Sequence, residues 1–489
     1  MVVDQMDNNF IDSLRCINKD IKKEYKSLRN RLQSILLDYT FLCTEVLPCF
    51  PEYPLVPNER CGLWYCNPKD FTQTSYFKST DGHTNQWDFS SRRLNFHIIP
   101  TIAKSNGIII VDSTRRGKKV PDALSKTIPI WCAVLNHLML ESQGGSVKQE
   151  TLYVPPETVS ESEFYSIKSR IPELVEKLKS LEVINGKELH KQLGGKLLRP
   201  FWIYPGSSIL QSTTDIFTGE VTSDKWIPVD NSIIPIILCT VSYQAQDGVD
   251  KRRGFTYVQG AADDHELWSH GLNAKIFWSN IDILGNQESS EEELERFVSQ
   301  LSLRGCDLSK EIQFSDAFPQ IDLVTPELSL GLVIDNLEFN PKLIGEIRQA
   351  HSLVIVLSQS VNFPQKVAEM ENASEFISIH KLQSGSKVSS RNLKTELLKI
   401  VPLIEKHILD LDKQRKPVLI CCNSGTDMSI GLLLVVLCRN YNMDWQLNTP
   451  TSVSKIVVKK HLAKLISHLK GRNVNPPRAT LNSVNSYLM

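Results

Sequence analysis

A short acidic stretch near the middle of the chain holds residues of the types that bind metals and move protons. Asp263, Asp264 and Glu266 lie within four positions and could hold Mg²⁺ through carboxylate oxygens shared with a substrate pyrophosphate. His265 lies among them and could instead act as a general base. The same acids would also suit the exposed first turn of a helix capped by Asp263. The pattern indicates either a metal site with a base or an acidic helix start.

A second stretch joins a predicted buried strand to a basic loop. Residues 107–112 form a continuous apolar run that ends at Asp112, a candidate general base. Cationic and hydroxyl side chains that could bind a substrate follow it: Arg115, Arg116, Lys118, Ser125 and Lys126. Backbone N–H groups and cations directly after a strand are suited to binding an anion. The sequence therefore predicts a phosphate site here, with an exposed basic turn as the alternative.

Residues 76–95 add more cations and a second candidate base. Lys78, Arg92 and Arg93 could bind an anionic substrate, and His83 could serve as the base in place of Asp112. Between 78 and 119 there are eight Lys or Arg and three Asp, and from 445 to 489 there are seven Lys or Arg and no acid. The whole chain has 55 basic and 55 acidic residues, which excludes a globally basic protein. Such local imbalance favours a polyanionic partner.

Residues 418–431 resemble the signature loop of cysteine-dependent dual-specificity phosphatases. Cys422 matches the nucleophile of that family, but Met428 stands at the position of its arginine. The family's general-acid Asp is also missing, since no Asp occurs between 358 and 409. We therefore expect no phosphatase activity, because no guanidinium clamps the transferring group. The loop could still bind phosphate through Asn423, Ser424, Gly425, Thr426, Asp427 and Ser429. Alternatively, Cys422 is a buried thiol in a strand–turn–helix corner.

The elements that position these residues follow an α/β pattern in two domains. A mixed α/β domain is expected over 1–285, a connection over 286–340, and a phosphatase-like α/β domain over 341–489. An amphipathic helix with a basic face is predicted over 9–38, either solvated or facing RNA. Other predicted elements are strands at 233–240, 353–357 and 417–421, and helices at 391–412, 430–440 and 453–469.

Several classes of protein are disfavoured by the composition. The apolar runs at 233–239 and 430–438 are far shorter than the ~20 residues of a membrane helix. The acidic start lacks the apolar core of a signal peptide, and eleven dispersed cysteines indicate reduced thiols. We therefore expect a cytoplasmic protein without a membrane partner.

Four stretches, taken together, resemble the fungal and plant initiator-tRNA ribosyl-phosphate transferases. They read SYFKSTDGHTNQWDFSSRRLN, GIIIVDSTRRGK with PDALSKTIPIW, YVQGAADDHELW, and CCNSGTDMSIG. The resemblance implies transfer of a ribosyl phosphate to the 2′-hydroxyl of adenosine 64, in the T stem of initiator methionine tRNA. This marks the tRNA against use in elongation. It also implies 5-phosphoribosyl 1-pyrophosphate as donor, a divalent ion such as Mg²⁺, and a family-specific N-terminal domain beside a phosphatase-like domain.

Chemistry then suggests roles for the candidate residues. We expect Asp263 and Asp264 to hold Mg²⁺, and Arg115, Arg116 and Lys118 to contact the pyrophosphate. The donor's 5-phosphate would bind the loop 423–429. The base stays open between Asp112 and His83. The alternative function is a catalytically inactive phosphatase-like protein that binds phosphorylated protein or RNA, and an active phosphatase is the third possibility.

Overall fold

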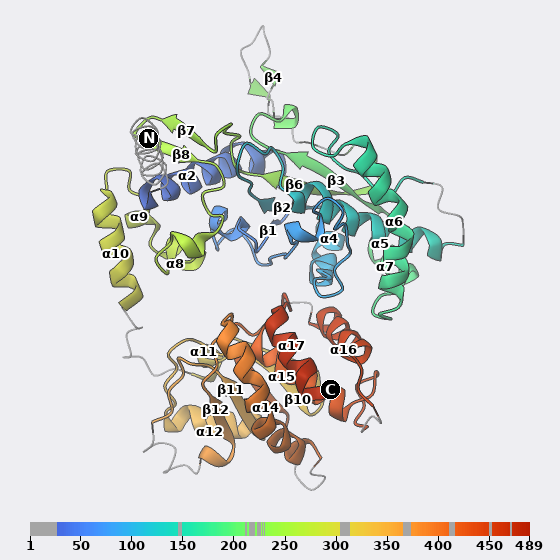
Figure 1. Ribbon diagram of the computed structural model, residues 1–489, viewed down its shortest axis with the longest axis vertical. Coiled ribbons are helices and arrows are strands. Elements are labelled where there is room, and N and C mark those ends of the chain that lie inside the picture. The colour runs from blue at the N-terminus through green and yellow to red at the C-terminus, as the bar shows by residue number, and fades with distance from the viewer. Residues whose placement is uncertain are drawn as a thin grey trace, which may run out of the picture. The chain divides into compact units, whose positions relative to one another are not determined.

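The computed structural model describes residues 27–144, 149–210, 213–214, 221–222, 226, 228, 230–303, 313–364, 373–409, 416–448, 452–469 and 472–489. The chain divides into two compact units (Figure 1). Unit 1 comprises Met1–Phe89, Ile98–Lys177 and Asn185–Arg304, and unit 2 comprises Ser90–His97, Leu178–Ile184 and Gly305–Met489. Both combine helices with a largely parallel sheet, as expected of an α/β protein.

Unit 1 is built on a four-stranded parallel sheet in the order β1-β2-β6-β3. Its strands are β1 Leu55–Pro57, β2 Ile108–Asp112, β3 Leu197–Ile203 and β6 Ile233–Thr240. The predicted strands at 107–112 and 233–240 are thus confirmed. Because all four strands run in one direction, the residues that follow β1, β2 and β6 meet at one edge, where parallel sheets commonly bind ligands.

The helices of unit 1 are α2 Leu28–Phe41, α3 Leu47–Cys49, α4 Ile99–Ser105, α5 Ile128–Ser142, α6 Glu161–Lys179, α7 Gly186–Gln192, α8 Ala274–Ser279, α9 Ile281–Leu284 and α10 Glu291–Leu303. The helical stretch Ala123–Ser142 is long and apolar enough to span a membrane by length and composition. Within it, an apolar window of 18 residues is 89% buried inside the protein. The stretch is therefore a core helix, and it was not predicted from the sequence.

Helix α2 packs along the strand β8 (Phe255–Val258), which pairs with β7 (Val249–Arg252) (Figure 1). Asn30 and Ser34 of α2 accept hydrogen bonds from the backbone N–H groups of Thr256 and Val258, at 3.1 and 2.8 Å. These bonds satisfy the strand edge that β7 leaves open. Helix α2 therefore holds the segment that leads from β8 into Asp263.

The predicted basic face of the N-terminal helix is only partly visible, because residues 1–26 lie outside the described residues. Arg29 donates to the carbonyls of Gly254, Gln287 and Ser289, and Arg31 donates to the carbonyl of Ala261. Glu291, from the acidic start of α10, accepts from the backbone N–H groups of Leu28 and Arg29 at 2.6 and 2.8 Å. The described arginines of this helix therefore bind the protein's own backbone.

Unit 2 holds a five-stranded sheet in the order β12-β11-β13-β10-β9, in which only the β9–β10 pair is antiparallel. Its strands are β9 Gln320–Thr325, β10 Leu328–Leu332, β11 Leu353–Leu357, β12 Ile377–His380 and β13 Val418–Cys422. Its helices are α11 Phe314–Ala317, α12 Pro341–Ala350, α14 Lys387–Ile408, α15 Met428–Asn440, α16 Lys455–His468 and α17 Arg478–Leu488.

Two features of unit 2 differ from the expected organisation. Helix α17, which was not among the predicted helices, follows α16 and packs against α14 and α15. The expected connection over 286–340 is shared between the units. Helix α10 packs against α2 of unit 1, whereas β9 and β10 complete the sheet of unit 2. By composition alone, an acidic helix and two short strands cannot be distinguished from a linker.

Asp38 generates a prediction about stability. It is fully buried, Oδ1 accepts a hydrogen bond from Tyr257 at 2.9 Å, and Oδ2 has no partner among the described residues. Burial raises the pKa of Asp38 well above its ordinary value, against the smaller lowering effect of the Tyr257 hydrogen bond. The folded state therefore binds more protons than the unfolded chain, and the free energy of unfolding falls as pH rises above about 4.

We expect Asp38→Asn to raise the melting temperature at pH 8, because it removes this proton linkage, and to lose that advantage toward pH 4. Thermal melts from pH 4 to 8 measure the effect, with the exposed Asp282→Asn as the control. A variant that is less stable than the wild type at every pH would contradict this prediction.

Candidate functional site

Asp112 ends β2 at the carboxyl edge of the sheet and is completely buried. It accepts hydrogen bonds from the side chains of Asn58, Arg60 and Cys61, and from the backbone N–H of Ser113, at 2.8 to 3.1 Å. These donors occupy both carboxylate oxygens, and no water can reach them. This environment argues against the predicted role of Asp112 as a base and makes it a structural anchor instead.

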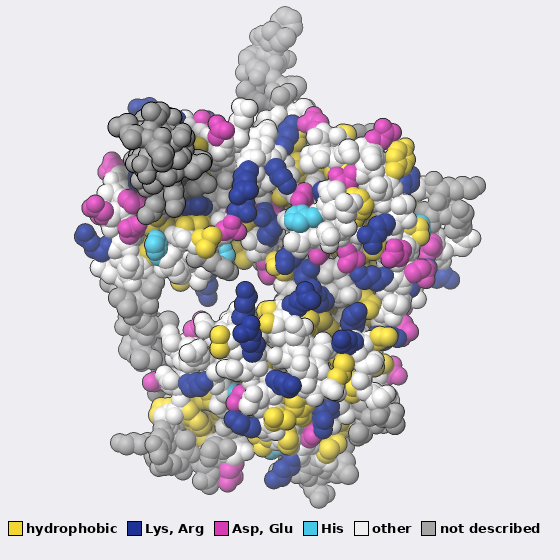
Figure 2. Space-filling view, in the orientation of Figure 1, with side chains coloured by type: hydrophobic (Ala, Val, Ile, Leu, Met, Phe, Trp, Pro, Cys, Tyr) yellow, Lys and Arg dark blue, Asp and Glu magenta, His cyan; other side chains and the backbone are white. Residues whose placement is uncertain are grey.

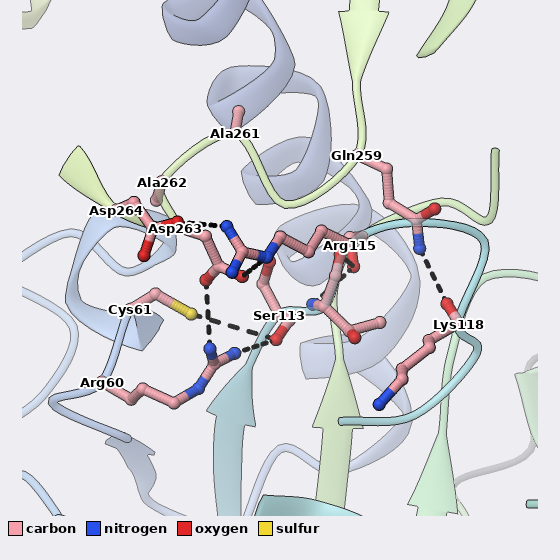
Figure 3. Close-up of polar contacts among 12 residues, drawn as sticks. Arg60, Cys61, Ser113, Arg115, Lys118, Gln259, Ala261, Ala262, Asp263 and Asp264 are labelled. Atoms are coloured by element: carbon pink, nitrogen blue, oxygen red, sulfur yellow. Dashed lines mark hydrogen bonds and ion pairs between the residues drawn. The ribbon is translucent and has the colours of Figure 1, made fainter. Parts of the chain in front are cut away.

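Arg60 connects Asp112 to the acidic stretch, and Figure 3 shows its contact with Asp263. Its Nε lies 3.0 Å from Asp112 Oδ2, and its Nη1 lies 3.1 Å from Asp263 Oδ1. Burial lowers the pKa of Arg60, but the charges of Asp112 and Asp263 outweigh burial and raise it above its ordinary value. Burial raises the pKa of Asp263, whereas the positive charge of Arg60 lowers it, and the net effect is a raised pKa. One guanidinium therefore compensates two carboxylates that are far apart in sequence.

Arg115 extends the network toward solvent (Figure 3). Its Nε lies 3.7 Å from Asp263 Oδ2, and its Nη1 is paired with Asp264. The Arg115 and Asp264 side chains are 44% and 54% exposed, so a ligand can reach them. The predicted basic loop and the predicted acidic stretch thus lie together, joined by ion pairs.

Gln259 fixes the basic loop in place. Its Oε1 accepts from the backbone N–H of Gly117 at 2.8 Å, and its Nε2 donates to the carbonyl of Lys118 at 2.7 Å (Figure 3). Gly260 has φ +65°, and a Cβ there would lie 2.7 Å from the Thr114 carbonyl oxygen. The loop can pack this closely only against a glycine.

A cavity of about 210 Å³ opens beside this network. Its walls include three guanidinium groups, three carboxylates and an indole: Arg31, Arg115, Arg116, Asp247, Asp263, Asp264 and Trp268. The Arg31 guanidinium lies 5.0 Å from the centre of the Trp268 ring, a cation–π contact that holds it at the wall. The three guanidinium groups could contact an anionic ligand such as a pyrophosphate, and the three carboxylates could contact a cation bound to that ligand.

The acidic stretch fits magnesium only in part. Among the described residues, no group of three or more His, Cys, Asp or Glu side chains is arranged to hold a metal ion. Asp263 and Asp264 nevertheless both line the cavity. Mg²⁺ is typically held by one or two carboxylates together with substrate phosphates and water, so these residues fit a magnesium–pyrophosphate unit. The side chain of Glu266 lies outside the described residues.

His265 lies in the short 3-10 turn that follows Asp264. Its ring packs against Trp64 with the ring centres 5.6 Å apart. The turn shows no side-chain cap from Asp264, and the indole N–H of Trp268 donates to the Asp263 carbonyl at 3.2 Å. The expected alternative, an acidic helix start capped by Asp263, is therefore not what the structure shows.

The remaining predicted residues of unit 1 differ in their surroundings. His83 and Lys126 share the carboxylate of Asp122, which Lys118 also approaches. Ser125 is buried and donates to the Pro121 carbonyl within its own helical turn, so the structure gives it a structural contact rather than the predicted substrate contact. Lys78 is exposed.

Arg92 and Arg93 belong to the segment Ser90–His97, which clusters with unit 2 and not with the unit that holds the cavity. Both are half-buried and interact with other residues of the protein. The structure therefore does not group them with Lys78 and His83, although the four residues are close in sequence.

The phosphatase-type loop of unit 2 joins β13 to α15, as predicted. The thiol of Cys422 is buried and lies 3.0 Å from Ser429 Oγ and 3.5 Å from Ser424 Oγ. Burial raises its pKa, but hydrogen bonds from these hydroxyls and from Ser384 outweigh burial, and the net effect is a lowered pKa. The loop thus stabilises negative charge at this sulfur without an arginine.

Other groups in this loop are turned to structural use. The carboxylate of Asp427 accepts from the Gly385 N–H at 2.8 Å and from the Thr480 hydroxyl at 2.6 Å. It therefore ties the loop to the turn before α14 and to α17, and does not face a ligand as predicted. The guanidinium of Arg472 donates to the Gly425 carbonyl at 2.9 Å and is paired with Asp322. This guanidinium therefore holds the backbone of the loop at Gly425.

Known protein families match the chain in two parts, one mainly in unit 1 and one in unit 2. Residues 21–303 match the family described as the Rit1 N-terminal domain, and residues 377–488 match the Rit1 DUSP-like domain. The chain is also 56% identical over 494 residues to the tRNA A64-2′-O-ribosylphosphate transferase of Saccharomyces cerevisiae, covering 99% of this chain and 96% of that protein. The chain belongs to the Rit1 family. An uncharacterized protein of Schizosaccharomyces pombe is 41% identical over 277 residues, 56% of each chain.

Within this Rit1 family member, reasoning from sequence missed three residues that the site depends on. Arg60 follows β1, whose three residues are too few to stand out as a strand. Arg31 lies on a helix whose basic face was interpreted as solvated or facing RNA. Asp122 directly precedes a helical turn, a position that could have drawn attention to it. Its partners lie 4 to 39 residues away, so the sequence does not show that they meet.

The shared guanidinium leads to a second prediction. Arg60→Gln leaves the buried Asp112 without a compensating charge and leaves Asp263 with Arg115 alone, and breaking a buried pair in this way costs about 3–5 kcal/mol of unfolding free energy. Urea denaturation measures the loss. Arg170→Gln, which breaks the surface pair with Glu173 on α6, serves as the control and should change stability by less than about 1 kcal/mol. Equal losses in the two variants would contradict the role assigned to Arg60.

Proposed function

We propose that this protein transfers a 5-phosphoribosyl group from 5-phosphoribosyl 1-pyrophosphate to the 2′-hydroxyl of adenosine 64 in the T stem of initiator methionine tRNA. The observation that carries the proposal is the near full-length similarity to a tRNA A64-2′-O-ribosylphosphate transferase. The arginine-lined cavity of unit 1 supports it, because the donor carries a pyrophosphate and the cavity gathers three cations. We place the protein in the cytoplasm.

The chemistry of the reaction matches the contents of the cavity. In this transfer the bond from the anomeric carbon to pyrophosphate breaks ahead of attack, so positive charge develops on the sugar and negative charge on the leaving group. Arg115, Arg116 and Arg31 would bind the pyrophosphate and stabilise its growing charge. Asp263 and Asp264 would hold Mg²⁺ together with the pyrophosphate. The bound ion would neutralise part of the leaving group's charge.

Recognition of the tRNA would depend on the shape and backbone of a double-stranded stem, whose shallow groove exposes 2′-hydroxyls. Lys and Arg side chains gather on the visible faces of both units (Figure 2). On α16, Lys455 and Lys459 are exposed, whereas Lys460 pairs with Glu182 and Lys464 donates to the Met443 carbonyl. The first two are therefore the free cations of this helix, and binding should weaken steeply with salt.

The loop 423–429 stays a predicted phosphate-binding site of unit 2. The alternative function, a catalytically inactive phosphatase-like protein that binds phosphorylated protein or RNA, would use this loop as well. It gives no role to the arginine-lined cavity of unit 1, and we therefore favour the transferase.

The deciding experiment incubates the protein with Mg²⁺, initiator tRNA and the donor labelled in its ribose, and follows label in the tRNA. We expect transfer by the wild type. Arg116→Ala should lower kcat/KM for the donor by about 10²–10³-fold, because it removes a cation that faces the developing charge. Arg253→Ala, which removes an exposed cation outside the cavity, is the control. Absence of transfer by folded wild-type protein would rule out the proposed function.

The thiol of unit 2 gives a separate prediction. Cys422→Ser should keep transfer within about 3-fold of the wild type, because the reaction needs no sulfur nucleophile. Neither protein should hydrolyse an aryl phosphate. Turnover of that substrate by the wild type, abolished in Cys422→Ser, would identify a phosphatase and contradict our interpretation of the loop.

A further inference from the structure

His83 forms an oriented pair with Asp122 beside the basic loop. Its Nδ1 lies 2.7 Å from Asp122 Oδ2, and the imidazole is 48% exposed. We propose that His83 is the general base that removes the proton from the attacking 2′-hydroxyl, and that Asp122 is its positioning residue. This inference rests on the proposed function and chooses between the two bases that the sequence left open.

The hydrogen bond decides which ring nitrogen can act. A carboxylate can only accept a hydrogen bond, so Nδ1 carries the proton and Nε2 is left with the lone pair. Because the imidazole is half exposed, a hydroxyl group can approach Nε2. Asp112, the other candidate, is completely buried and its oxygens accept five hydrogen bonds. Geometry therefore favours His83.

The surroundings of Asp122 favour the ionised form of its carboxylate. Lys126 Nζ lies 3.3 Å from Oδ1, and Lys118 Nζ lies 3.6 Å from Oδ2. Burial raises the pKa of Asp122, but these two ammonium groups and the His83 hydrogen bond outweigh burial and hold it below its ordinary value. A charged carboxylate at neutral pH keeps the imidazole in one tautomer and stabilises the proton that it receives.

Contacts on both sides of the His83–Asp122 pair hold it in place. Gly82 packs so closely on the neighbouring turn that a Cβ there would lie 2.6 Å from Thr127 Oγ1 and 2.9 Å from the Asp122 carbonyl oxygen. Lys126, only 7% exposed, also binds Glu163 at 3.2 Å. The same Glu163 oxygen accepts hydrogen bonds from Thr84 and Trp87, the residues that follow His83. The loop around His83 is therefore fixed before any substrate binds.

The basic loop links this pair to the cavity. Arg115 and Arg116 line the cavity, and Lys118, two residues further along, approaches Asp122. Two hydrogen bonds with Gln259, one accepted from Gly117 and one donated to Lys118, hold the loop between these positions. The loop after β2 thus carries cations that line the cavity and leads to Asp122, which orients His83.

The proposed step is balanced in atoms and charge. The 2′-oxygen of the adenosine forms a bond to the anomeric carbon of the donor, and the bond from that carbon to the pyrophosphate oxygen breaks. Pyrophosphate leaves with the bonding electrons, and the proton of the 2′-hydroxyl passes to Nε2 of His83. The imidazolium releases this proton to solvent after the products leave.

Three variants test the inference in the labelled-donor assay. His83→Ala should lower kcat by about 10²–10⁴-fold, with KM for donor and tRNA unchanged, and added imidazole should restore part of the activity. Asp122→Asn should lower kcat by about 10-fold or more. His137→Ala, which removes a histidine paired with Glu141 on α5, should retain wild-type activity. Melting temperatures of all variants report folding.

Each outcome has a distinct meaning. Loss of kcat at an unchanged melting temperature, with rescue by imidazole, supports the base. Activity of His83→Ala within 3-fold of the wild type overturns this inference and leaves the proposed function intact. Loss that imidazole does not restore also overturns it, because it indicates a structural role. If the wild type itself transfers no label, the proposed function fails and this inference fails with it.

Discussion

The placement of the site depends on one guanidinium that sits between two carboxylates. Arg60 binds Asp112 at the end of β2 and Asp263 in the segment after β8. Each carboxylate alone would be costly to bury, and each is compensated because the other holds the arginine in place. The ion pairs continue through Arg115 to Asp264 at the surface. Charge alternates along this chain of residues, and it connects the core of the sheet to the cavity.

The two units use polar groups at loop ends in opposite ways. In unit 1 the loop after β2 presents arginines to a cavity. In unit 2 the loop after β13 turns Asp427 toward Gly385 and Thr480, and buries Met428 where a phosphatase would have its arginine. The second loop still joins a strand to the N-terminus of a helix, and its hydroxyls stabilise charge on Cys422. The positive end of the helix dipole at this position needs no arginine, because the backbone itself creates it.

The local sequence patterns predicted part of the secondary structure. Strands β2, β6, β11 and β13 and helices α14, α15 and α16 lie at or near the predicted positions, because each is a clear apolar run or an amphipathic period. The elements that were not predicted include the strands β1, β3, β9 and β10 and the helices α5, α6, α7, α12 and α17. Several of them are short or polar, and packing against neighbouring elements stabilises those more than their own residues do.

For the site, the sequence by itself determined which chemistry is present: a strand that feeds a basic loop, a pair of aspartates, and a histidine after a glycine. The tertiary structure decided how these residues are used. It buried Asp112 under five hydrogen bonds, brought in Arg60 and Arg31, and oriented His83 with Asp122. Arg60 and Asp112 meet because β1 and β2 run parallel and end at the same edge, and the segment after β8 brings Asp263 to the same guanidinium. Local periodicity carries no information about contacts of that range.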